Sequence, residues 1–195
     1  MLTLYHAPQS RSSRIVWLLE EIGAPYQIEK MNIPRRDGSG ASDPRNPHPD
    51  KKVPAIVHDG VLVTESAAIC LYLADAFPEA RVGPRIGEPL RADFVTWLAY
   101  YAGVIEPVMA AKASGATDKD PVQEAAYVAV VERIRLALER GPFVLGDSFS
   151  AADVLVTSVL QWGRQLMPVS QVFDAYVARM SERGALQRAL EKDDA

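Results

Sequence analysis

The sequence predicts an α/β N-terminal module of βαβ-ββα order, followed by an all-α module. Three observations lead to this fold class. The first 76 or so residues alternate short strand-like runs with amphipathic helical patterns, a stretch rich in Pro and Gly follows at residues 77–89, and only helical spacing appears after it. The 195 residues are enough for two small domains that share an interface.

The first three elements of the N-terminal module form a predicted βαβ unit. Residues 2–5 and 26–33 have the composition of strands, and apolar residues at positions 15, 18, 19 and 22 recur between them at helical spacing. Gly23 stands where a helix C-terminus belongs. Because one helix joins the two strands so closely, we expect the strands to be parallel.

A hairpin and a second helix complete the module. Residues 34–50 are rich in Pro, Arg, Asp, Gly and Ser and are predicted to be irregular. Residues 53–57 and 61–63 are predicted strands, with a turn at Asp59-Gly60 between them. Apolar residues at positions 69, 72, 73 and 76 then indicate an amphipathic helix.

A linker over residues 79–88 is predicted to separate a first domain at 1–78 from a helical domain at 89–195. Residues 150–162 are apolar nearly all round and are predicted to form a buried helix. The other expected features of this domain are a helix over 90–108 with a kink at Pro107, helices over 127–138, 173–180 and 185–190, and a frayed tail at 191–195.

Charge and composition exclude several classes of partner. The formal net charge of −4 offers no basic field for nucleic acid or for an anionic membrane surface. The N-terminus lacks the charged and apolar regions of a signal peptide, and no apolar run is expected to be long enough to cross a membrane. We therefore expect a cytoplasmic protein that binds neither nucleic acid nor membranes.

The cysteine and histidine content limits the possible chemistry. The single cysteine, Cys70, excludes an intramolecular disulfide and CxxC motifs, and its place on the apolar side of a predicted helix indicates a buried structural thiol. The three histidines, His6, His48 and His58, lack the spacing of metal ligands, so no metal site is expected.

The first candidate segment lies between the first predicted strand and helix, and it carries three hydroxyls, those of Ser10, Ser12 and Ser13. A hydroxyl here stands beside a helix N-terminus, where free N–H groups and the helix dipole favour an anion. The same pattern would arise if one of these serines were simply an N-cap.

The second candidate segment is Lys52-Val53-Pro54, at the entrance to the third strand. A proline there cannot donate to a sheet ladder. If the Val53–Pro54 bond is cis, the backbone N–H and C=O of Val53 turn outward and can pair with an extended peptide. An edge-strand proline without a function would give the same pattern.

The third candidate segment opens the second predicted helix with Glu65 and Ser66. Ser66 can offer its hydroxyl and backbone N–H to a carboxylate, and Glu65 can accept hydrogen bonds from an ammonium group. A group with both charges is an α-amino-acid head. A capping pair on an ordinary surface helix would look the same.

In their order and spacing, these segments resemble the soluble glutathione transferases, of the bacterial type with a serine in the first loop. The resemblance covers essentially the whole chain and rests on LYHAPQSRSSRIVWLLEEIGAPYQ, HPDKKVPAIVHDG, TESAAICLYLAD and FVLGDSFSAADVLV. In the last of these, Ser150 and Asp153 are a predicted capping box. The resemblance implies a thioredoxin-like glutathione-binding domain, a helical domain with the electrophile pocket, and a homodimer.

The resemblance also implies roles for individual residues. Ser10 matches the family's thiol-activating serine, because it lies two residues after Pro8 and four before Arg14. Ser12 and Ser13 remain alternates, and Arg11 is expected to favour the thiolate as well.

The glutathione site implied by the resemblance uses residues from all three segments. Val53, before Pro54, would pair with the cysteinyl backbone of glutathione, and Glu65 and Ser66 would hold its γ-glutamyl head. Many relatives have Gly where Lys51 stands, so the loop before Val53 is expected to differ from theirs. Candidates for the glycyl carboxylate are Lys52, Lys51 and His48, and candidates for the electrophile pocket are Tyr101, Trp97, Met109 and Trp162.

The implied activity is conjugation of the glutathione thiolate to small hydrophobic electrophiles, a detoxification reaction. Glutathione is the co-substrate, and no tightly bound cofactor is expected. Isomerisation or peroxide reduction with glutathione is an alternative on the same fold, as is a non-catalytic glutathione- or ligand-binding interaction module.

Overall fold

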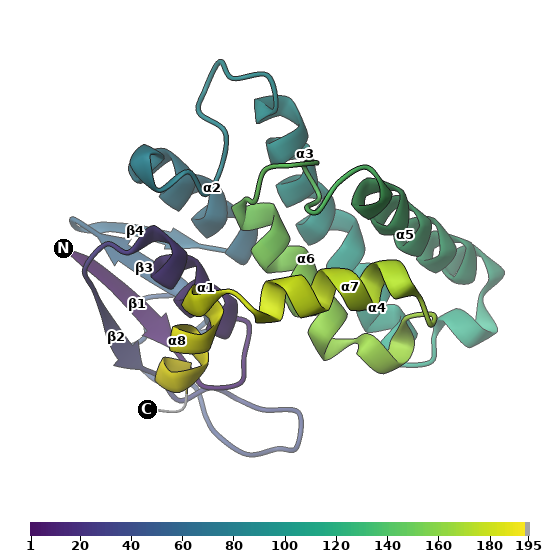
Figure 1. Ribbon diagram of the computed structural model, residues 1–195. Helices are drawn as coiled ribbons and strands as arrows, with labels where there is room; N and C mark the ends of the chain where they lie inside the picture. Colours follow the sequence, from purple (N-terminus) through teal and green to yellow (C-terminus); the bar gives the residue numbers. More distant parts are fainter. Residues whose placement is uncertain (194–195) are drawn as a thin grey trace.

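The computed structural model describes residues 1–193 and has a four-stranded sheet on one side and a set of helices on the other (Figure 1). The βαβ-ββα order predicted for the N-terminal part is confirmed. Its elements are β1 (Leu2–His6), α1 (Ser13–Ile22), β2 (Tyr26–Lys30), β3 (Ala55–His58), β4 (Val61–Thr64) and α2 (Ser66–Ala76).

The sheet has the strand order β2-β1-β3-β4, in which β1 and β2 are parallel and the other pairs are antiparallel. Tyr5, near the end of β1, lies opposite Ala55 at the start of β3. Ala55 in turn lies opposite Thr64 at the end of β4. The loop after β1, the entrance to β3 and the exit of β4 therefore meet at one end of the sheet.

Local sequence explains where these elements stop. Gly23 ends α1 in the left-handed region, with φ +71°, and its N–H donates to Leu19 O at 2.9 Å. Asp59 and Gly60 both have positive φ, as a tight hairpin between β3 and β4 requires. The predicted second strand ran three residues too far, because the Met31 N–H donates to His6 O and the chain then leaves the sheet.

The main core is one apolar cluster that extends from the sheet, α1 and α2 into the helical module. Leu2, Leu4 and His6 of β1 are buried and alternate with partly exposed residues, as expected for a strand with one covered face. A smaller apolar cluster contains Ala7 and Val53.

Beyond β4, the described residues contain helices and no further strand, so the predicted all-α module is confirmed. The α-helices are α3 (Arg91–Tyr100), α4 (Glu106–Ala113), α5 (Pro121–Glu139), α6 (Ala151–Trp162), α7 (Gln171–Ser181) and α8 (Gly184–Asp193). Short 3₁₀ turns occupy Pro78–Ala80, Thr117–Lys119 and Arg164–Leu166.

A π-helical turn, Tyr101–Ile105, joins α3 to α4 without a break. It stands just before Pro107, where a kink was expected. Because the proline ring conflicts with the carbonyl four residues earlier, the wider turn accommodates it.

By length and composition alone, the continuous stretch Arg91–Ala113 could cross a membrane, contrary to our expectation, but core helices of soluble proteins meet the same criteria.

Helix α6 begins with the predicted capping box. The Ser150 Oγ accepts from the Ala152 N–H at 3.3 Å, and Asp153 Oδ2 accepts from the Ser150 N–H at 2.9 Å. Asp153 Oδ1 also accepts from the Val144 N–H and the Tyr176 hydroxyl. The helix is buried along most of its length, as predicted, although Trp162 at its end is half exposed.

The C-terminal helix α8 returns to the N-terminal module and packs along α1 (Figure 1). The expectation of a frayed tail is therefore wrong for residues 191–193, while residues 194–195 lie outside the described residues. Glu20 of α1 is 8% exposed and pairs with Arg188 and Lys192 of α8. This contact joins residues far apart in the sequence, which local pattern could not reveal.

Candidate functional site

The loop after β1 holds Ser10 beside the start of α1. The Ser10 hydroxyl lies 2.7 Å from Ala7 O and accepts from the Ser12 N–H at 3.1 Å. Its neighbour Gln9 has φ +52°, a left-handed conformation that a residue with a side chain adopts only when its surroundings hold it there. These contacts fix the position of the Ser10 hydroxyl, and the residue itself is partly exposed.

The other two serines of this loop have different surroundings. Ser12 is completely buried, with its Oγ 2.8 Å from His6 Nδ1 and accepting from the Ala7 N–H at 3.1 Å. Ser13 is the first residue of α1, and its Oγ accepts from the Ser10 N–H at 3.2 Å. The burial of Ser12 keeps its hydroxyl from contacting a ligand directly.

Arg11 and Arg14 connect this loop to the helical module. Both guanidinium groups donate to Glu106 Oε1, Arg11 Nε at 2.9 Å and Arg14 Nη1 at 3.1 Å. The Tyr101 hydroxyl donates to the same oxygen at 2.8 Å. Burial raises the pKa of Glu106, but the Arg14 charge and the hydrogen bonds outweigh it, so the pKa lies below its ordinary value. The cluster fixes the start of α1 against α4.

The segment before β3 has backbone groups that can bind a ligand. The Val53–Pro54 peptide bond is cis. Within residues 1–193, neither backbone group of Val53 has a hydrogen-bond partner. The completely buried Asn46 supports this segment, because its Nδ2 donates to Lys52 O and its Oδ1 accepts from the His48 N–H, both at 2.9 Å.

The three candidates for a carboxylate-binding cation differ in how they are held. Lys51 Nζ donates to Asn46 O at 2.7 Å, so it is tied to its own loop. His48 is 4% exposed, and its Nδ1 accepts from the Asp50 N–H. Lys52 has a largely exposed side chain that contacts Asp50 at 3.4 Å. Lys52 is therefore the candidate whose ammonium group can most easily reach the carboxylate of a ligand.

Glu65 and Ser66 stand at the junction of β4 and α2. Glu65 has φ +66°, which costs a residue with a side chain about 1–3 kcal/mol. Ser66 is the first residue of α2, and no side chain caps that helix. The N–H groups of its first turn are therefore available to an anion, with the Glu65 carboxylate beside them.

The sheet register brings these three segments together. Because Tyr5, Ala55 and Thr64 are opposite one another, the Ser10 loop, Val53 and Glu65-Ser66 lie at the same end of the sheet. This end combines a hydroxyl at a helix start, an open peptide edge, and a helix N-terminus next to a carboxylate. Such a set suits an extended peptide with an α-amino-acid head.

Comparison with known proteins agrees with this geometry. The family described as glutathione S-transferase, N-terminal domain, matches residues 1–75. Glutathione S-transferase GstA of Escherichia coli O157:H7 is 25% identical over 195 residues, which cover 97% of both chains. Residues 1–75 thus belong to the glutathione S-transferase N-terminal domain family. Glutathione S-transferase 3 of Schizosaccharomyces pombe is 44% identical over 73 residues, covering 37% of this chain and 29% of that protein.

The solved structures extend the similarity to the helical part of the chain. A glutathione S-transferase from Actinobacillus pleuropneumoniae superposes with a TM-score of 0.83 at 26% identity, covering all of this chain and 94% of the other. The predicted fold class, a thioredoxin-like domain followed by a helical domain, is confirmed.

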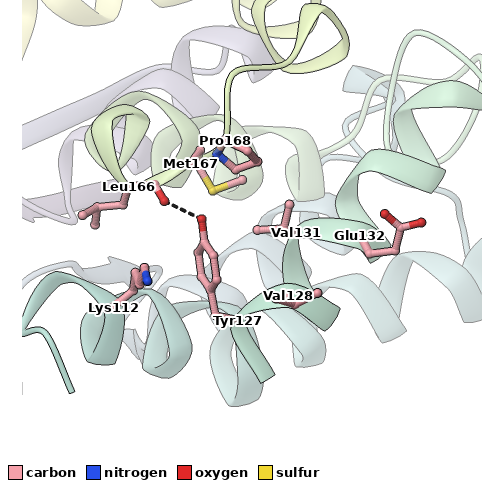
Figure 2. Close-up of a pocket in the computed structure, with 8 residues that line it drawn as sticks. All are labelled: Lys112, Tyr127, Val128, Val131, Glu132, Leu166, Met167 and Pro168. Atoms are coloured by element: carbon pink, nitrogen blue, oxygen red, sulfur yellow. Dashed lines mark hydrogen bonds between the residues drawn. The ribbon is translucent and has the colours of Figure 1, made fainter. Parts of the chain in front are cut away.

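The helical domain has an open pocket of about 440 Å³ between α4, α5 and residues 166–168 (Figure 2). The Tyr127 hydroxyl donates to Leu166 O across it, and the Lys112 ammonium lies 4.8 Å from the Tyr127 ring centre. Figure 1 shows α5 on the side of the helical domain away from the sheet, so this pocket lies apart from the Ser10 loop.

The residues predicted for an electrophile pocket do not line that cavity. Trp97, Tyr101 and Met109 are buried, with the Tyr101 hydroxyl engaged by Glu106 and Arg14. Trp162 is half exposed at the end of α6. Their role in binding an electrophile remains a prediction.

Several residues around the site were not identified from the sequence. His6 was considered only as a metal ligand, and Asp193 was assigned to a frayed tail, yet His6 Nε2 lies 3.4 Å from both Asp193 O and Oδ1. Glu106 and Asn46 were not identified at all. The polar Asn46 in a proline-rich loop was a usable signal, whereas the contacts of Asp193 and Glu106 cross between distant elements and leave no local pattern.

Cys70 is completely buried, as predicted, and burial raises the pKa of its thiol to about 12. Within residues 1–193, no three His, Cys, Asp or Glu side chains are grouped as metal ligands.

Proposed function

We propose that this protein is a glutathione transferase, that it conjugates the thiol of glutathione to small hydrophobic electrophiles, and that Ser10 stabilises the thiolate. The observation that carries the proposal is the convergence of the Ser10 loop, Val53 and Glu65-Ser66 at one end of the sheet. Each of these segments suits one part of an extended γ-glutamyl tripeptide.

The proposed binding mode follows the chemistry of the three segments. The γ-glutamyl carboxylate accepts from the first turn of α2 and the Ser66 hydroxyl, and its ammonium donates to Glu65. The cysteinyl backbone pairs with the free N–H and C=O of Val53. Lys52 is assigned to the glycyl carboxylate, since its exposed ammonium has only a 3.4 Å contact with Asp50, whereas Lys51 Nζ donates to Asn46 O at 2.7 Å and His48 is buried.

The proposed role of Ser10 is to donate a hydrogen bond to sulfur. A free thiol has a pKa of about 8.5, so only about 3% is thiolate at pH 7. One hydrogen bond to a charged group contributes about 1.5–3 kcal/mol, which corresponds to about one to two pKa units. The start of α1 adds to this effect. Arg11 contributes a further positive charge, reduced by its pairing with Glu106.

The thiolate then attacks an electrophilic carbon or displaces a leaving group. We place the electrophile on the side of the site that faces the helical domain, with Tyr101, Trp97, Met109 and Trp162 as the candidates. A cytoplasmic location and a homodimer are part of the proposal and rest on the similarity to glutathione transferases. Isomerisation or peroxide reduction would use the same thiolate, and a non-catalytic binding module would keep the site without turnover.

The test is a glutathione titration by calorimetry, followed by the ultraviolet absorbance of bound thiolate across pH. Binding with a thiol pKa clearly below 8.5 supports a catalytic site, and turnover of an electrophile panel then identifies the reaction class. Binding without thiolate would favour the non-catalytic module. No binding at millimolar glutathione would overturn the proposal.

A further inference from the structure

A line of polar atoms runs inward from Ser10. The Ser10 Oγ lies 2.7 Å from Ser12 Oγ, which lies 2.8 Å from His6 Nδ1. On the other side of the ring, His6 Nε2 lies 3.4 Å from the backbone oxygen and from Oδ1 of Asp193. His6 and Ser12 are completely buried, so bulk water does not separate these groups.

The hydrogen-bond acceptors along this line indicate which atom carries each hydrogen. Asp193 O accepts from His6 Nε2–H, so the neutral ring has a free lone pair on Nδ1. The Ser12 hydroxyl can donate to that lone pair while its oxygen accepts from Ser10. Ala7 O offers a second acceptor to both hydroxyls, 2.7 Å from Ser10 Oγ and 3.2 Å from Ser12 Oγ. In this arrangement the Ser10 hydroxyl donates to Ser12 Oγ, and the Ser12 hydroxyl donates to His6 Nδ1.

We propose that this line is a proton relay in which His6 accepts the proton of the thiol that Ser10 activates. The inference rests on the proposed function. The S–H bond breaks and its proton goes to Ser10 Oγ, while the Ser10 hydroxyl proton passes to Ser12 Oγ and the Ser12 proton to His6 Nδ1. The products are a thiolate and an imidazolium, with no change in oxidation state and no proton lost to solvent.

The relay leaves the Ser10 hydroxyl correctly oriented for the role proposed above. Before transfer, Ser10 donates away from the ligand. After transfer, its hydrogen is the one received from sulfur, so the O–H bond points at the thiolate and stabilises it. Ser12 then donates to Ser10, and His6 Nδ1–H donates to Ser12. One concerted shift therefore both removes the proton and forms the stabilising hydrogen bond.

The charges around His6 fit a temporary proton acceptor. Burial lowers the pKa of His6 below its ordinary value, which keeps the ring neutral and able to accept near pH 7. Lys30, opposite His6 on β2, acts in the same direction, and Asp193 on α8 opposes both. Within residues 1–193, the buried Asp193 Oδ1 has no hydrogen-bond donor, so it is available to stabilise the imidazolium.

Asp193 also holds the loop in which the relay begins. Its Oδ2 accepts from the N–H of Gln9, the residue with positive φ next to Ser10, at 2.9 Å. One carboxylate therefore contacts both the loop that carries Ser10 and the ring at the far end of the relay.

The decisive experiment follows the protonation of His6 in the wild-type protein. Nitrogen NMR of the imidazole is recorded with saturating glutathione and with S-methylglutathione, which has no thiol proton. We expect an imidazolium at His6 with glutathione and a neutral ring with S-methylglutathione. Calorimetry in buffers of different ionisation enthalpy should show fewer protons released than thiolate formed.

The variant His6→Asn assigns the NMR signal and tests the effect on rate. Asparagine can accept a hydrogen bond from Ser12 but cannot take its proton. Glutathione affinity should stay within about threefold, while the rate of the chemical step at pH 7 falls about 10- to 100-fold, the lower range of general base catalysis. His58→Gln, at the opposite end of the sheet beside Tyr72, is the matched control and should leave the rate unchanged.

The outcomes separate this inference from the proposed function. A bound thiolate with a neutral His6 and one proton released per thiolate would overturn the relay alone. Failure of glutathione to bind would overturn both. If His6→Asn does not fold, the two wild-type measurements still decide the question.

Discussion

The guanidinium of Arg183 donates two hydrogen bonds to the carboxylate of Glu21, from Nε to Oε1 at 2.6 Å and from Nη2 to Oε2 at 2.8 Å. The two residues are 162 positions apart in the sequence. The Arg183 Cζ atom also lies 3.7 Å from the centre of the Phe149 ring, and Trp17 Nε1 donates to Glu21. This contact joins the end of the helical domain to the helix that follows the proposed catalytic loop.

The first prediction concerns this contact. Arg183→Lys keeps the charge but loses the paired geometry and the stacking on Phe149, so the free energy of unfolding should fall by about 1–3 kcal/mol. Urea denaturation measures this loss in the free energy of unfolding. The control is Arg135→Lys on the exposed face of α5, whose pairs with Glu132 and Glu139 should contribute less than about 1 kcal/mol. Equal losses in the two variants would contradict a special role for the Arg183 contact.

The second prediction is a pH dependence at Glu20. Burial raises the pKa of this carboxyl, but hydrogen bonds from Lys192, Tyr26 and Arg188 outweigh burial and lower it below its ordinary value. A carboxyl whose folded-state pKa is lowered stabilises the fold above its unfolded-state pKa of about 4.3 and loses that contribution as the pH falls through the folded-state pKa.

Glu20→Gln should therefore destabilise the protein at pH 7 by about 1 kcal/mol, since the two cations are about half exposed. The difference between the variant and the wild type should shrink as the pH falls below about 4.3. Urea unfolding at several pH values measures this. A difference that stays constant across that range would show that the contribution of Glu20 is not ionic.

The third prediction tests the thiol partner. Ser10→Ala should lower kcat/KM about 10- to 100-fold, the equivalent of losing one hydrogen bond to a charged sulfur, while calorimetric affinity for glutathione changes little. Ser13→Ala is the control, because its hydroxyl is equally close to the loop but accepts from the Ser10 N–H. If Ser13→Ala produces the loss and Ser10→Ala does not, the thiol partner is Ser13.

The fourth prediction concerns the γ-glutamyl head. Ser66→Ala removes one hydroxyl and leaves the backbone N–H groups of α2, so the glutathione Kd should rise about tenfold or more with little further effect on the bound thiol pKa. Ser39→Ala, an exposed loop hydroxyl paired with Asp37, provides the control for calorimetry. An unchanged Kd in Ser66→Ala would remove this residue from the proposed site.

The candidate site was predictable where its signals were local. The positions of Ser10, Val53 and Glu65-Ser66 at element boundaries follow from strand and helix patterns, and each boundary lies within three residues of its expected place. The surroundings of these residues were not predictable. That Ser12 is buried against His6 while Ser10 is partly exposed depends on the path of one short loop.

Local sequence was enough to predict the order of the elements, the turn at Asp59-Gly60, the end of α1 at Gly23 and the capping box at Ser150, because each depends on contacts within a few residues. It could not predict that Glu20 and Glu21 are paired or that α8 reaches the Ser10 loop. Those contacts join residues from opposite ends of the chain, and a charged residue follows the same local pattern whether water or a distant partner surrounds it.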